Sequence, residues 1–577
     1  MTIAASRASA RRGVELVPRG TSIHALAAQV RAALPSAEGV RLVDGAVRVT
    51  IPQATWLIQN RQLAIEWERD VVRFIENRAR SNGRRDVEEA HRILTLSAGE
   101  LRPLIEECRL LPLLDDHQLR NVALMTIADS TGACIFDEQG TGKTISVVAA
   151  FDLLVERNEA DVLLVVAPKS MVGEWKVEIE RFTENDYKVA VLDGSRADKA
   201  AALETRADVY VCNYETLLAV PDNLRLLCER SRVVIAADES FTVKNPDAGR
   251  TQALGRVREW CVRAFVLCGT PAPNDASDVI AQVSLVDLGR AFGGLQLSRD
   301  PDEQREQIRD VIQQEVVFSR NLKSVVLPDL PGRTFTELRV EMEPEQRALY
   351  ISVAGALAGE LQQVSDAQFR ADYTSYFARR AALLRICSDP SAVDSSIQEA
   401  PAKLLALDAL LAQWIGAGEK VVLWSFYRST LDRLAQRYAH YGLVRVDGSV
   451  GDVSERRAAV ASFQNDPSTH VFLGNPAAAG AGITLHSAAI SVYESMSNQA
   501  AHYLQSLDRT HRRGQVRDVE YVALLCDGTI EWPEYERLHM KAAMQADLLG
   551  DPTPDTMTRE LMLSELVASL EALGGGS

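Results

Sequence analysis

Residues 135–144, with the sequence IFDEQGTGKT, contain the residue types that bind the phosphates of a nucleotide. Gly140 and Gly142 allow the backbone to curl, so that its N–H groups and the start of the next helix face a phosphate chain. Lys143 would reach the β- and γ-phosphates, and the Thr144 hydroxyl would bind Mg²⁺. A strict phosphate-loop pattern has glycine where this chain has Asp137. The segment predicts an ATP site whose binding residues are Gly140, Thr141, Gly142, Lys143 and Thr144.

A second acidic motif follows 95 residues after Lys143, where the apolar run 233–237 ends in Asp238 and Glu239. A buried strand that ends in two carboxylates delivers them to the carboxyl edge of a sheet. Asp238 would hold Mg²⁺ directly or through water, and Glu239 would orient the attacking water as general base. Together with the phosphate loop, this pair predicts a nucleotide hydrolase that uses ATP and Mg²⁺.

A third motif lies at 503–515, where Gln505 precedes a cluster of arginines. Arg509 and Arg512 are three residues apart, so on a helix they would share one face. Two guanidiniums on one face of a second lobe can reach a γ-phosphate as arginine fingers, which can raise the rate roughly 10³- to 10⁵-fold. A solvated basic helix is the alternative. We expect Gln505, Arg509 and Arg512 to be catalytic.

Short apolar runs alternate with amphipathic helical stretches in two parts of the chain, about 110–275 and 420–530. Runs of four to six apolar residues separated by helices are typical of a buried parallel sheet. The fold class predicted is therefore α/β, with two parallel-sheet lobes, and the charged helical pattern of about 276–395 lies between them. The expected strands are 133–136, 162–167, 209–212, 233–236, 265–268, 421–424, 443–446, 471–473, 490–493 and 519–524.

Taken in order, these motifs make the chain resemble helicase superfamily-two ATPases of the Swi/Snf type, the chromatin-remodeller and DNA-translocase family. The resemblance is collinear over about 110–540 and implies two RecA-like lobes with helical insertions. It implies that Gln118 lies on the adenine side. Further segments that resemble family motifs are 167–170 with Trp175, 238–245, 269–271 with Asn274, 327–331, 384–390, 447–449 with Arg456, 480–482 and 505–515. The chain departs from the family at Thr141, where leucine is usual, and at Ser240.

The resemblance implies an ATP-dependent double-stranded DNA translocase that remodels nucleoprotein, with DNA repair and anti-phage defence among the roles of such proteins. A strand-separating DNA or RNA helicase and an ATP-gated partner-binding switch remain the alternatives. Contacts to DNA are expected to be with phosphates, and an ordinary solvated polar residue is the alternative for each candidate. These candidates are Lys169, Ser170, Lys244, Arg428 and Thr484.

The chain has 577 residues, so at least three packed units are expected. The predicted domains are 1–105, a small N-terminal α+β accessory domain; 106–335, the first lobe with a helical insertion near 276–325; 336–398, a helical region; 399–545, the second lobe; and 546–577, a C-terminal helix and tail. The first residues are rich in Ala, Ser and Arg without a clear pattern, and a strand pair near 40–51 and a helix over 66–80 follow.

The formal net charge is −16, so any DNA must be met by a local basic groove. Residues 1–100, with a charge of +4, are expected either to dock a protein partner or to form a solvated helical cap. The 8 cysteines lack any C-x-x-C pair, which argues against a structural zinc site and a disulfide framework. No apolar stretch of membrane-spanning length is seen, so a cytoplasmic location is expected, associated with the nucleoid if the source is prokaryotic.

Overall fold

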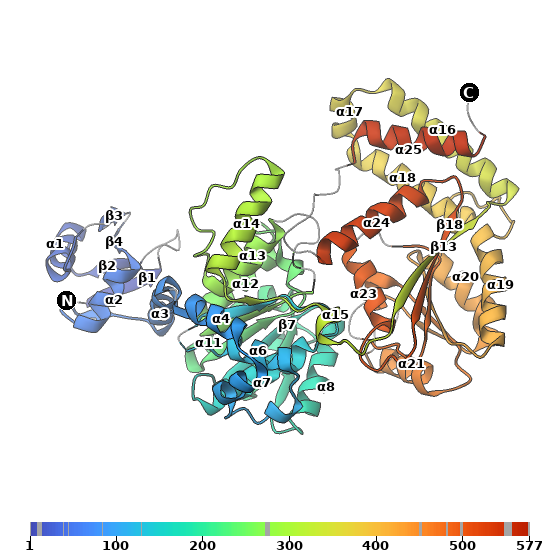
Figure 1. Cartoon of the computed structure of the whole chain (residues 1–577). Coiled ribbons are helices and arrows are strands. Elements are labelled where there is room, and N and C mark those ends of the chain that lie inside the picture. Colours follow the sequence, from blue (N-terminus) through green and yellow to red (C-terminus); the bar gives the residue numbers. More distant parts are fainter. Residues whose placement is uncertain are drawn as a thin grey trace. The chain divides into compact units, whose positions relative to one another are not determined.

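The computed structural model describes residues 2–7, 14–37, 40–43, 45–83, 85–128, 130–269, 271, 277–448, 453–479, 483–496, 500–546 and 557–574. The chain divides into two compact units, Met1–Leu322 and Lys323–Ser577. Each unit contains one parallel sheet, as the α/β prediction requires (Figure 1).

The N-terminal part has a sheet of its own, with the strand order β3-β4-β2-β1-β5. Val14 and Leu16 of β2 are fully buried, whereas Glu15 between them pairs with Arg48 of β4, so the sheet buries one face. The expected strand pair and helix are present as β3, β4 and α3, but β1 and β2 lie in the segment without a clear pattern. The elements are β1 (Thr2–Arg7), β2 (Val14–Arg19), α1 (Ile23–Ala33), β3 (Arg41–Val43), β4 (Ala46–Val49), α2 (Ile51–Asn60), β5 (Ile65–Glu66) and α3 (Arg69–Gly83).

The first parallel sheet has the order β12-β6-β11-β10-β7-β9-β8, and helices such as α7 and α8 pack against it. Its strands are β6 (Gly132–Ile135), β7 (Val162–Ala167), β8 (Val189–Val191), β9 (Val209–Asn213), β10 (Val233–Ala237), β11 (Arg263–Leu267) and β12 (Phe318–Ser319). Its helices are α4 (Arg85–Thr95), α5 (Ala98–Leu101), α6 (Asp116–Met125), α7 (Lys143–Glu156), α8 (Val172–Phe182), α9 (Arg196–Glu204), α10 (Thr216–Ala219), α11 (Pro221–Arg230), α12 (Gly249–Trp260), α13 (Asp278–Asp287) and α14 (Pro301–Glu315).

Two helices before residue 105 belong to the core of this lobe rather than to the N-terminal sheet. Val87, Ala90 and Ile93 of α4 and Leu101 of α5 are buried in one cluster with Leu119 and other residues of the first lobe. The N-terminal core instead ends with Phe74 and Ile75 of α3. The predicted boundary at residue 105 is therefore wrong, and the structure moves it to the α3–α4 junction.

The second parallel sheet has the order β13-β18-β17-β14-β16-β15. Its strands are β13 (Arg333–Val340), β14 (Val421–Trp424), β15 (Leu443–Val446), β16 (Val471–Gly474), β17 (Ile490–Tyr493) and β18 (Val519–Cys526). Strand β13 pairs along its whole length with β18, so the predicted lobe boundary at residue 335 is also wrong (Figure 1). The helices of this sheet are α19 (Ala402–Gly416), α20 (Arg428–Tyr438), α21 (Val453–Asn465), α22 (Pro476–Ala479), α23 (Ala500–Thr510) and α24 (Glu531–Ala546).

The short helix α15 (Lys323–Val326) precedes β13. Four other helices of the second unit pack together although they are far apart in sequence: α16 (Pro344–Gln363), α17 (Asp366–Ala371), α18 (Tyr373–Ser388) and α25 (Arg559–Ala572). Met562 and Leu566 of α25 share one buried cluster with Tyr350 and Leu357 of α16 (Figure 1). The predicted region 336–398 and the C-terminal helix therefore share one hydrophobic core.

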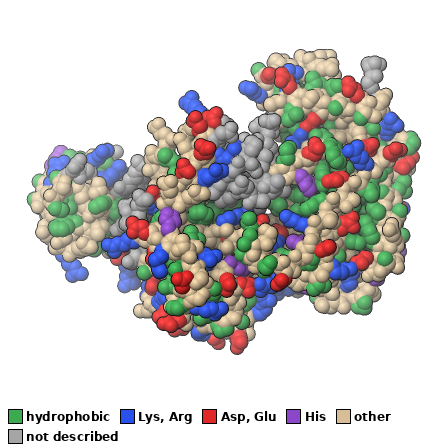
Figure 2. Space-filling model, in the orientation of Figure 1, with side chains coloured by type: hydrophobic (Ala, Val, Ile, Leu, Met, Phe, Trp, Pro, Cys, Tyr) green, Lys and Arg blue, Asp and Glu red, His purple; other side chains and the backbone are tan. Residues whose placement is uncertain are grey.

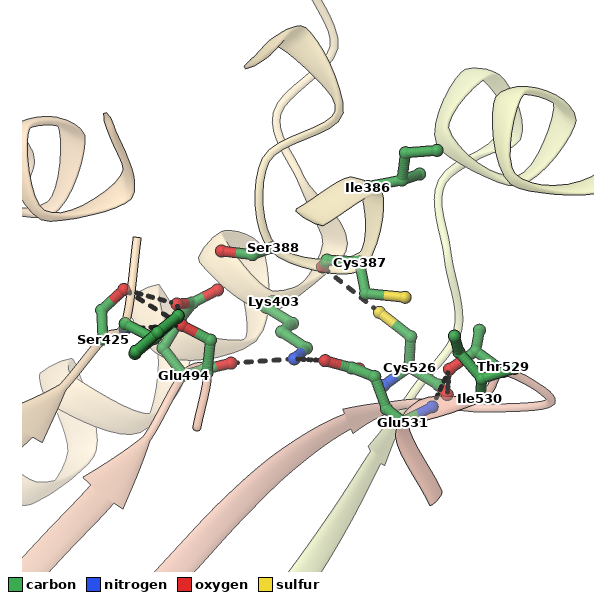
Figure 3. A network of polar contacts seen from close by, with 12 residues as sticks. Ile386, Cys387, Ser388, Lys403, Ser425, Glu494, Cys526, Thr529, Ile530 and Glu531 are labelled. Atoms are coloured by element: carbon green, nitrogen blue, oxygen red, sulfur yellow. Dashed lines mark hydrogen bonds and ion pairs between the residues drawn. The ribbon is translucent and has the colours of Figure 1, made fainter. Parts of the chain in front are cut away.

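A buried polar network joins this helical core to the carboxyl edge of the second sheet (Figure 3). The Lys403 ammonium donates to Oε1 of Glu531 at 2.6 Å and to the carbonyl oxygen of Glu494 at 2.8 Å. The sulfur of Cys526 donates to the carbonyl of Cys387 at 3.4 Å. Burial alone would lower the pKa of Lys403, but Glu531 and the other acidic groups around it, Glu494 among them, together hold that pKa above its usual value.

All eight cysteines are buried as free thiols. On the face shown in Figure 2, basic and acidic side chains are interspersed over the described residues of both units. Among the described residues, no helix is both long and apolar enough to span a bilayer.

Candidate functional site

The phosphate loop lies between β6 and α7, at the carboxyl edge of the first sheet. Gly140 and Gly142 have φ angles of 81° and 85°, in the left-handed region that glycine adopts without strain. The Lys143 ammonium donates to the carbonyl oxygens of Asp137 at 2.8 Å and Glu138 at 3.0 Å. The lysine thus lies over its own loop, at the start of the helix whose N–H groups can bind phosphate.

Asp137, which takes the place of the first glycine of the strict pattern, is a fully buried carboxylate with several donors. One oxygen accepts a hydrogen bond from the side-chain amide of Asn121 at 2.6 Å. The other accepts from the backbone and the side-chain N–H of Asn321, both at 2.9 Å, and lies 2.7 Å from the Ser319 hydroxyl. An aspartate is needed here because it fastens the loop to α6 and to the segment after β12.

Gln118, the residue predicted to lie on the adenine side, contacts the loop, and both ends of its side-chain amide form hydrogen bonds. Its Nε2 donates to the carbonyl of Thr141 at 3.0 Å, and its Oε1 accepts from the backbone N–H of Asp115 at 2.9 Å. His117 Nε2 lies 2.8 Å from the same Thr141 oxygen. A Cβ on Gly142 would lie 2.2 Å from Gln118 Nε2, so this glycine is also needed for close packing.

Asp238 and Glu239 follow β10 at the same sheet edge. The Asp238 carboxylate accepts hydrogen bonds from the indole N–H of Trp175 at 2.8 Å and from the backbone N–H of Glu239 at 2.9 Å. Burial raises the pKa of Asp238, and the Trp175 hydrogen bond and the Lys143 charge oppose that rise. Lys143 and Asp238 are therefore close enough to interact electrostatically.

Glu239 has a φ of 49°, an uncommon conformation for a residue other than glycine. Its Oε1 accepts a hydrogen bond from Gln139 of the phosphate loop at 2.6 Å. Gly269 packs against Gln139, because a Cβ there would lie 2.9 Å from the Gln139 side chain. Gln139 of the phosphate loop, Glu239 and Gly269 thus lie side by side, although Thr270 and Asn274 lie outside the described residues.

The donor set fits Mg²⁺, which prefers oxygen ligands and is held through one or two carboxylates. Asp238 offers a buried carboxylate, and Thr144 offers a hydroxyl from the first turn of α7. Bound Mg²⁺ would neutralise phosphate charge. Around it, Lys143 can bind phosphate oxygens, Glu239 can accept a proton from water, and Trp175 orients the Asp238 carboxylate.

Sequence reasoning missed several residues that build this site: Asn121, Gln139, Tyr214, Gln282, Ser319 and Asn321. Tyr214 donates to the backbone carbonyl of Asp238 at 2.6 Å, and Gln282 accepts from the Ser240 hydroxyl at 2.6 Å. Trp175, which belongs by resemblance to the motif at 167–170, donates a hydrogen bond to the Asp238 carboxylate. One sign of these contacts is visible in the sequence: Asp137 stands where the strict phosphate-loop pattern has glycine.

In the second unit, Gln505 and Arg509 are both buried on α23. Arg512 lies beyond the helix, which ends at Thr510, so the prediction that both arginines share a helix face is wrong. The two guanidiniums nevertheless share one acceptor. Arg509 donates to the carbonyl oxygen of Ile483 at 3.3 Å, and Arg512 donates to the same oxygen at 3.2 Å. The glycines of the preceding motif, 480–482, and Ser449 lie outside the described residues.

The five candidate DNA contacts differ in exposure and pairing. Lys169 is exposed and Ser170 half-buried in a 3₁₀ turn after β7, and Arg428 is exposed at the start of α20. Lys244 forms an ion pair with Asp278 at 3.1 Å, so part of its charge is already compensated. Thr484 is half-buried, and its carbonyl accepts from Gln464 at 2.6 Å.

Comparison with known proteins gives two consecutive family matches, of which the first extends from the first unit into the second. The SNF2-related domain matches residues 117–392, and the helicase conserved C-terminal domain matches residues 402–514. An ISWI chromatin-remodeling complex ATPase of Saccharomyces cerevisiae is 27% identical over 70% of this chain and 38% of its own length. The chromodomain-helicase-DNA-binding protein 1-like of Mus musculus is 27% identical over 72% of this chain and 47% of its own length.

An uncharacterized ATP-dependent helicase of Mycoplasma pneumoniae is 24% identical over 69% of this chain and 38% of its own length. The chain thus spans less than half the length of these three relatives. The solved SWI2/SNF2 ATPase core of Sulfolobus solfataricus in complex with dsDNA aligns over 76% of this chain and 92% of that chain, at 21% identity and a TM-score of 0.34. The two consecutive family matches, over residues 117–392 and 402–514, place the chain in the SNF2-related family.

Proposed function

We propose that this ATPase is a translocase on double-stranded DNA, with domains that follow the two units and the N-terminal sheet described above. One observation carries the proposal: the phosphate loop, the Asp238–Glu239 pair and the turn bearing Lys169 all lie at the carboxyl edge of one parallel sheet. Ligands of open α/β sheets bind at that edge. A nucleotide and a polyanionic track could therefore act on the same set of loops.

The chemistry follows from the side chains. Lys143 and Thr144 would bind the phosphates and Mg²⁺, with Asp238 as the second oxygen ligand, and Glu239 would activate the attacking water. Arg509 and Arg512, with Gln505, would stabilise charge on the γ-phosphate. ATP would bind one conformation of the protein more tightly than another, partly through its γ-phosphate. Loss of that phosphate on hydrolysis would therefore shift the equilibrium between the conformations.

DNA recognition would be made through phosphates. Lys169, Ser170 and Lys244 are the candidates in the first unit, and Arg428 and Thr484 are those in the second. One nucleotide of advance per ATP corresponds to about 3.4 Å along a strand. The relatives of this chain include a chromatin-remodeling complex ATPase and a chromodomain-helicase-DNA-binding protein, which supports a DNA track.

The first experiment compares ATP turnover with double-stranded DNA, single-stranded DNA and RNA, in parallel with a triplex-displacement assay. We expect double-stranded DNA to stimulate turnover most, and a third strand to be displaced without unwinding of the duplex. Because the contacts would be to phosphates, stimulation should fall steeply as salt is raised. Unwinding of a forked duplex would favour a strand-separating helicase, and equal turnover with and without polymer would favour a partner switch.

The second experiment assigns roles in the ATP site. Lys143→Ala should abolish turnover because it removes the cation that binds the β- and γ-phosphates. Arg512→Ala should lower turnover by roughly 10³-fold or more while a fluorescent ATP analogue binds as before, because a finger acts in the transition state. Normal turnover by Arg512→Ala would contradict the finger assignment.

A further inference from the structure

The segment from Ser319 to Lys323 carries the chain from the first unit to the second. The unit boundary lies between Leu322 and Lys323. Each end of this segment, which we call the strap (residues 319–323), is fastened by hydrogen bonds inside its own unit. One end holds the phosphate loop, and the other holds the segment that bears Arg509.

The first end runs along the phosphate loop like an extension of β12. The backbone N–H groups of Phe136 and Glu138 donate to the carbonyls of Ser319 and Asn321 at 2.9 and 3.0 Å. Asp137, between them, accepts from the backbone and side-chain N–H of Asn321. The start of the loop and the strap therefore cannot move apart without exposing or breaking several buried hydrogen bonds.

Arg320 connects this end of the strap to Gly269, in the loop after β11. Its guanidinium donates to the carbonyl of Phe136 and, at 3.1 Å, to the carbonyl of Gly269. The strap thus contacts both the phosphate loop and the loop after β11, which packs on Gln139 and through it on Glu239.

The second end is held by a single buried lysine. The ammonium of Lys323 forms an ion pair with Asp508 and donates to the carbonyl of His511 at 3.1 Å. Asp508 directly precedes Arg509, and His511 directly precedes Arg512. Lys323 is 6% exposed, so it is one of the few lysines held inside the protein.

We infer that the strap couples the phosphate loop to the arginine segment, with Asp137 and Asp508 as positioning residues at its two ends. Leu322 alone separates Asn321 from Lys323, and two peptide units span at most about 7 Å. A short connection that is fixed at both ends transmits displacement. A long connection would absorb it.

Nucleotide binding supplies the displacement. Lys143 donates to the carbonyls of Asp137 and Glu138, the two loop residues that also bind Asn321. When the Lys143 ammonium binds phosphate instead, these carbonyls lose their donor and the loop must readjust. The strap carries that readjustment to Lys323 and so to Arg509. The arginine role rests on the proposed function, whereas the coupling does not depend on DNA.

A double-mutant cycle on the full chain tests the coupling, with kcat of ATP turnover and the affinity for a fluorescent ATP analogue as readouts. Asp137→Asn and Asp508→Asn lie in different units, so independent effects on kcat would multiply. We expect the double variant to be no slower than the slower single variant. We also expect Asp508→Asn to lower kcat about tenfold with ATP affinity unchanged within about twofold. If the two losses multiply, the inference is wrong.

The matched control pairs Asp137→Asn with Asp408→Asn, which removes the carboxylate of a surface ion pair with Arg437 in the second unit. The effects on kcat in this pair should multiply. If Asp137→Asn does not fold, Asn321→Ala replaces it in the cycle, because that variant keeps the backbone hydrogen bond to Asp137. Thermal unfolding of every variant shows which ones are folded.

An insertion gives an independent test. Two glycines after Leu322 would lengthen the strap while leaving both anchors intact, and should lower kcat while ATP affinity stays unchanged. The same insertion after Gly294, in an exposed loop of the first unit where a side chain would meet nothing within 4 Å, should leave kcat unchanged. Wild-type turnover after the Leu322 insertion would overturn the coupling. If DNA does not stimulate ATP turnover by the natural chain, but the effects of the two substitutions on kcat still do not multiply, the translocase proposal is wrong and the coupling stands.

Discussion

At the scale of single residues, burial raises the pKa of the Asp238 carboxyl group, and the hydrogen bond from Trp175 opposes that rise. The indole N–H stabilises the charged form, so Trp175→Phe should raise the pKa of Asp238 above its already raised value. The ionised carboxylate is the form that would bind Mg²⁺. The acid limb of the pH profile of kcat/KM should therefore move to higher pH, with a larger loss of turnover at pH 6 than at pH 8.

Tyr214→Phe is the control for this prediction. The Tyr214 hydroxyl donates to the backbone carbonyl of Asp238, not to its carboxylate. Its removal should leave the position of the acid limb unchanged, whatever it does to stability. An equal shift in both variants would show that loosened packing, rather than the indole hydrogen bond, sets the pH dependence.

Gly142 should not tolerate a side chain. Gly142→Ala would place a methyl group 2.2 Å from Gln118 Nε2 at a φ of 85°, so the loop must distort. We expect loss of ATP-analogue binding in a fluorescence titration. Gly418→Ala is the matched control, because Gly418 has a φ of 84° but open space around it. It should bind ATP normally and lose only about 1 kcal/mol of stability.

The residues that could be placed from sequence are those whose partners are local. Lys143, Asp238 and Glu239 each end or follow a strand, and strand ends can be read from apolar runs. The residues that hold them could not be found this way. Trp175 is 63 residues from Asp238, and Asn321 is 184 residues from Asp137, so only the folded chain brings each pair together.

At the scale of elements, the Lys403–Glu531 pair connects α19 to α24 beside the helical core. Lys403→Met would leave the Glu531 carboxylate buried without its partner, which costs about 3–5 kcal/mol. Thermal unfolding should show a clear loss of stability of the second unit. Lys403→Met combined with Glu531→Leu should recover much of it, because neither member of this ion pair is then left buried without the other.

The exposed pair Arg339–Asp527 is the control for that loss. The two side chains are 61% and 49% exposed, and removal of such a pair costs about 0–1 kcal/mol. Arg339→Gln should therefore unfold close to the natural chain. A loss as large as that of Lys403→Met would mean that burial of the charge is not the cause.

The expected strands were found because parallel sheets bury both faces and so leave uninterrupted apolar runs. Strand β13 escaped prediction because most of its side chains are exposed and its sequence, RTFTELRV, has no apolar run. Strand β12 has only two residues. The arginine helix was predicted too long, because residue spacing does not show where a helix ends.

At the scale of the whole molecule, the N-terminal sheet should be removable up to residue 84 but not up to residue 105. The longer deletion would remove Val87, Ala90, Ile93, Leu101 and Ile105 from the core of the first lobe. A buried Val, Ile or Leu side chain contributes about 1.5–3 kcal/mol, so the four of these alone contribute about 6–12 kcal/mol, which is comparable to a domain's total stability of about 5–15 kcal/mol. Thermal unfolding and ATP turnover of the two truncated chains would check this.

We expect the chain that begins at residue 85 to unfold near the natural temperature and to hydrolyse ATP. Equal behaviour of both truncated chains would contradict the boundary at the α3–α4 junction. Sequence alone placed that boundary too late, because α4 and α5 are amphipathic helices whose partner surface lies beyond residue 115. The docking of a protein partner by the N-terminal part stays a prediction.

Because every native cysteine is buried, cysteines introduced at exposed positions can be labelled with dyes in the natural chain. Maleimide dyes react with thiolates, and burial suppresses that form; it raises the pKa of Cys108, for instance, to about 11. A pair of cysteines introduced on exposed helices, one in each unit, would therefore take up the label without deletion of any native thiol. Energy transfer between two such dyes would follow each round of ATP hydrolysis on single molecules.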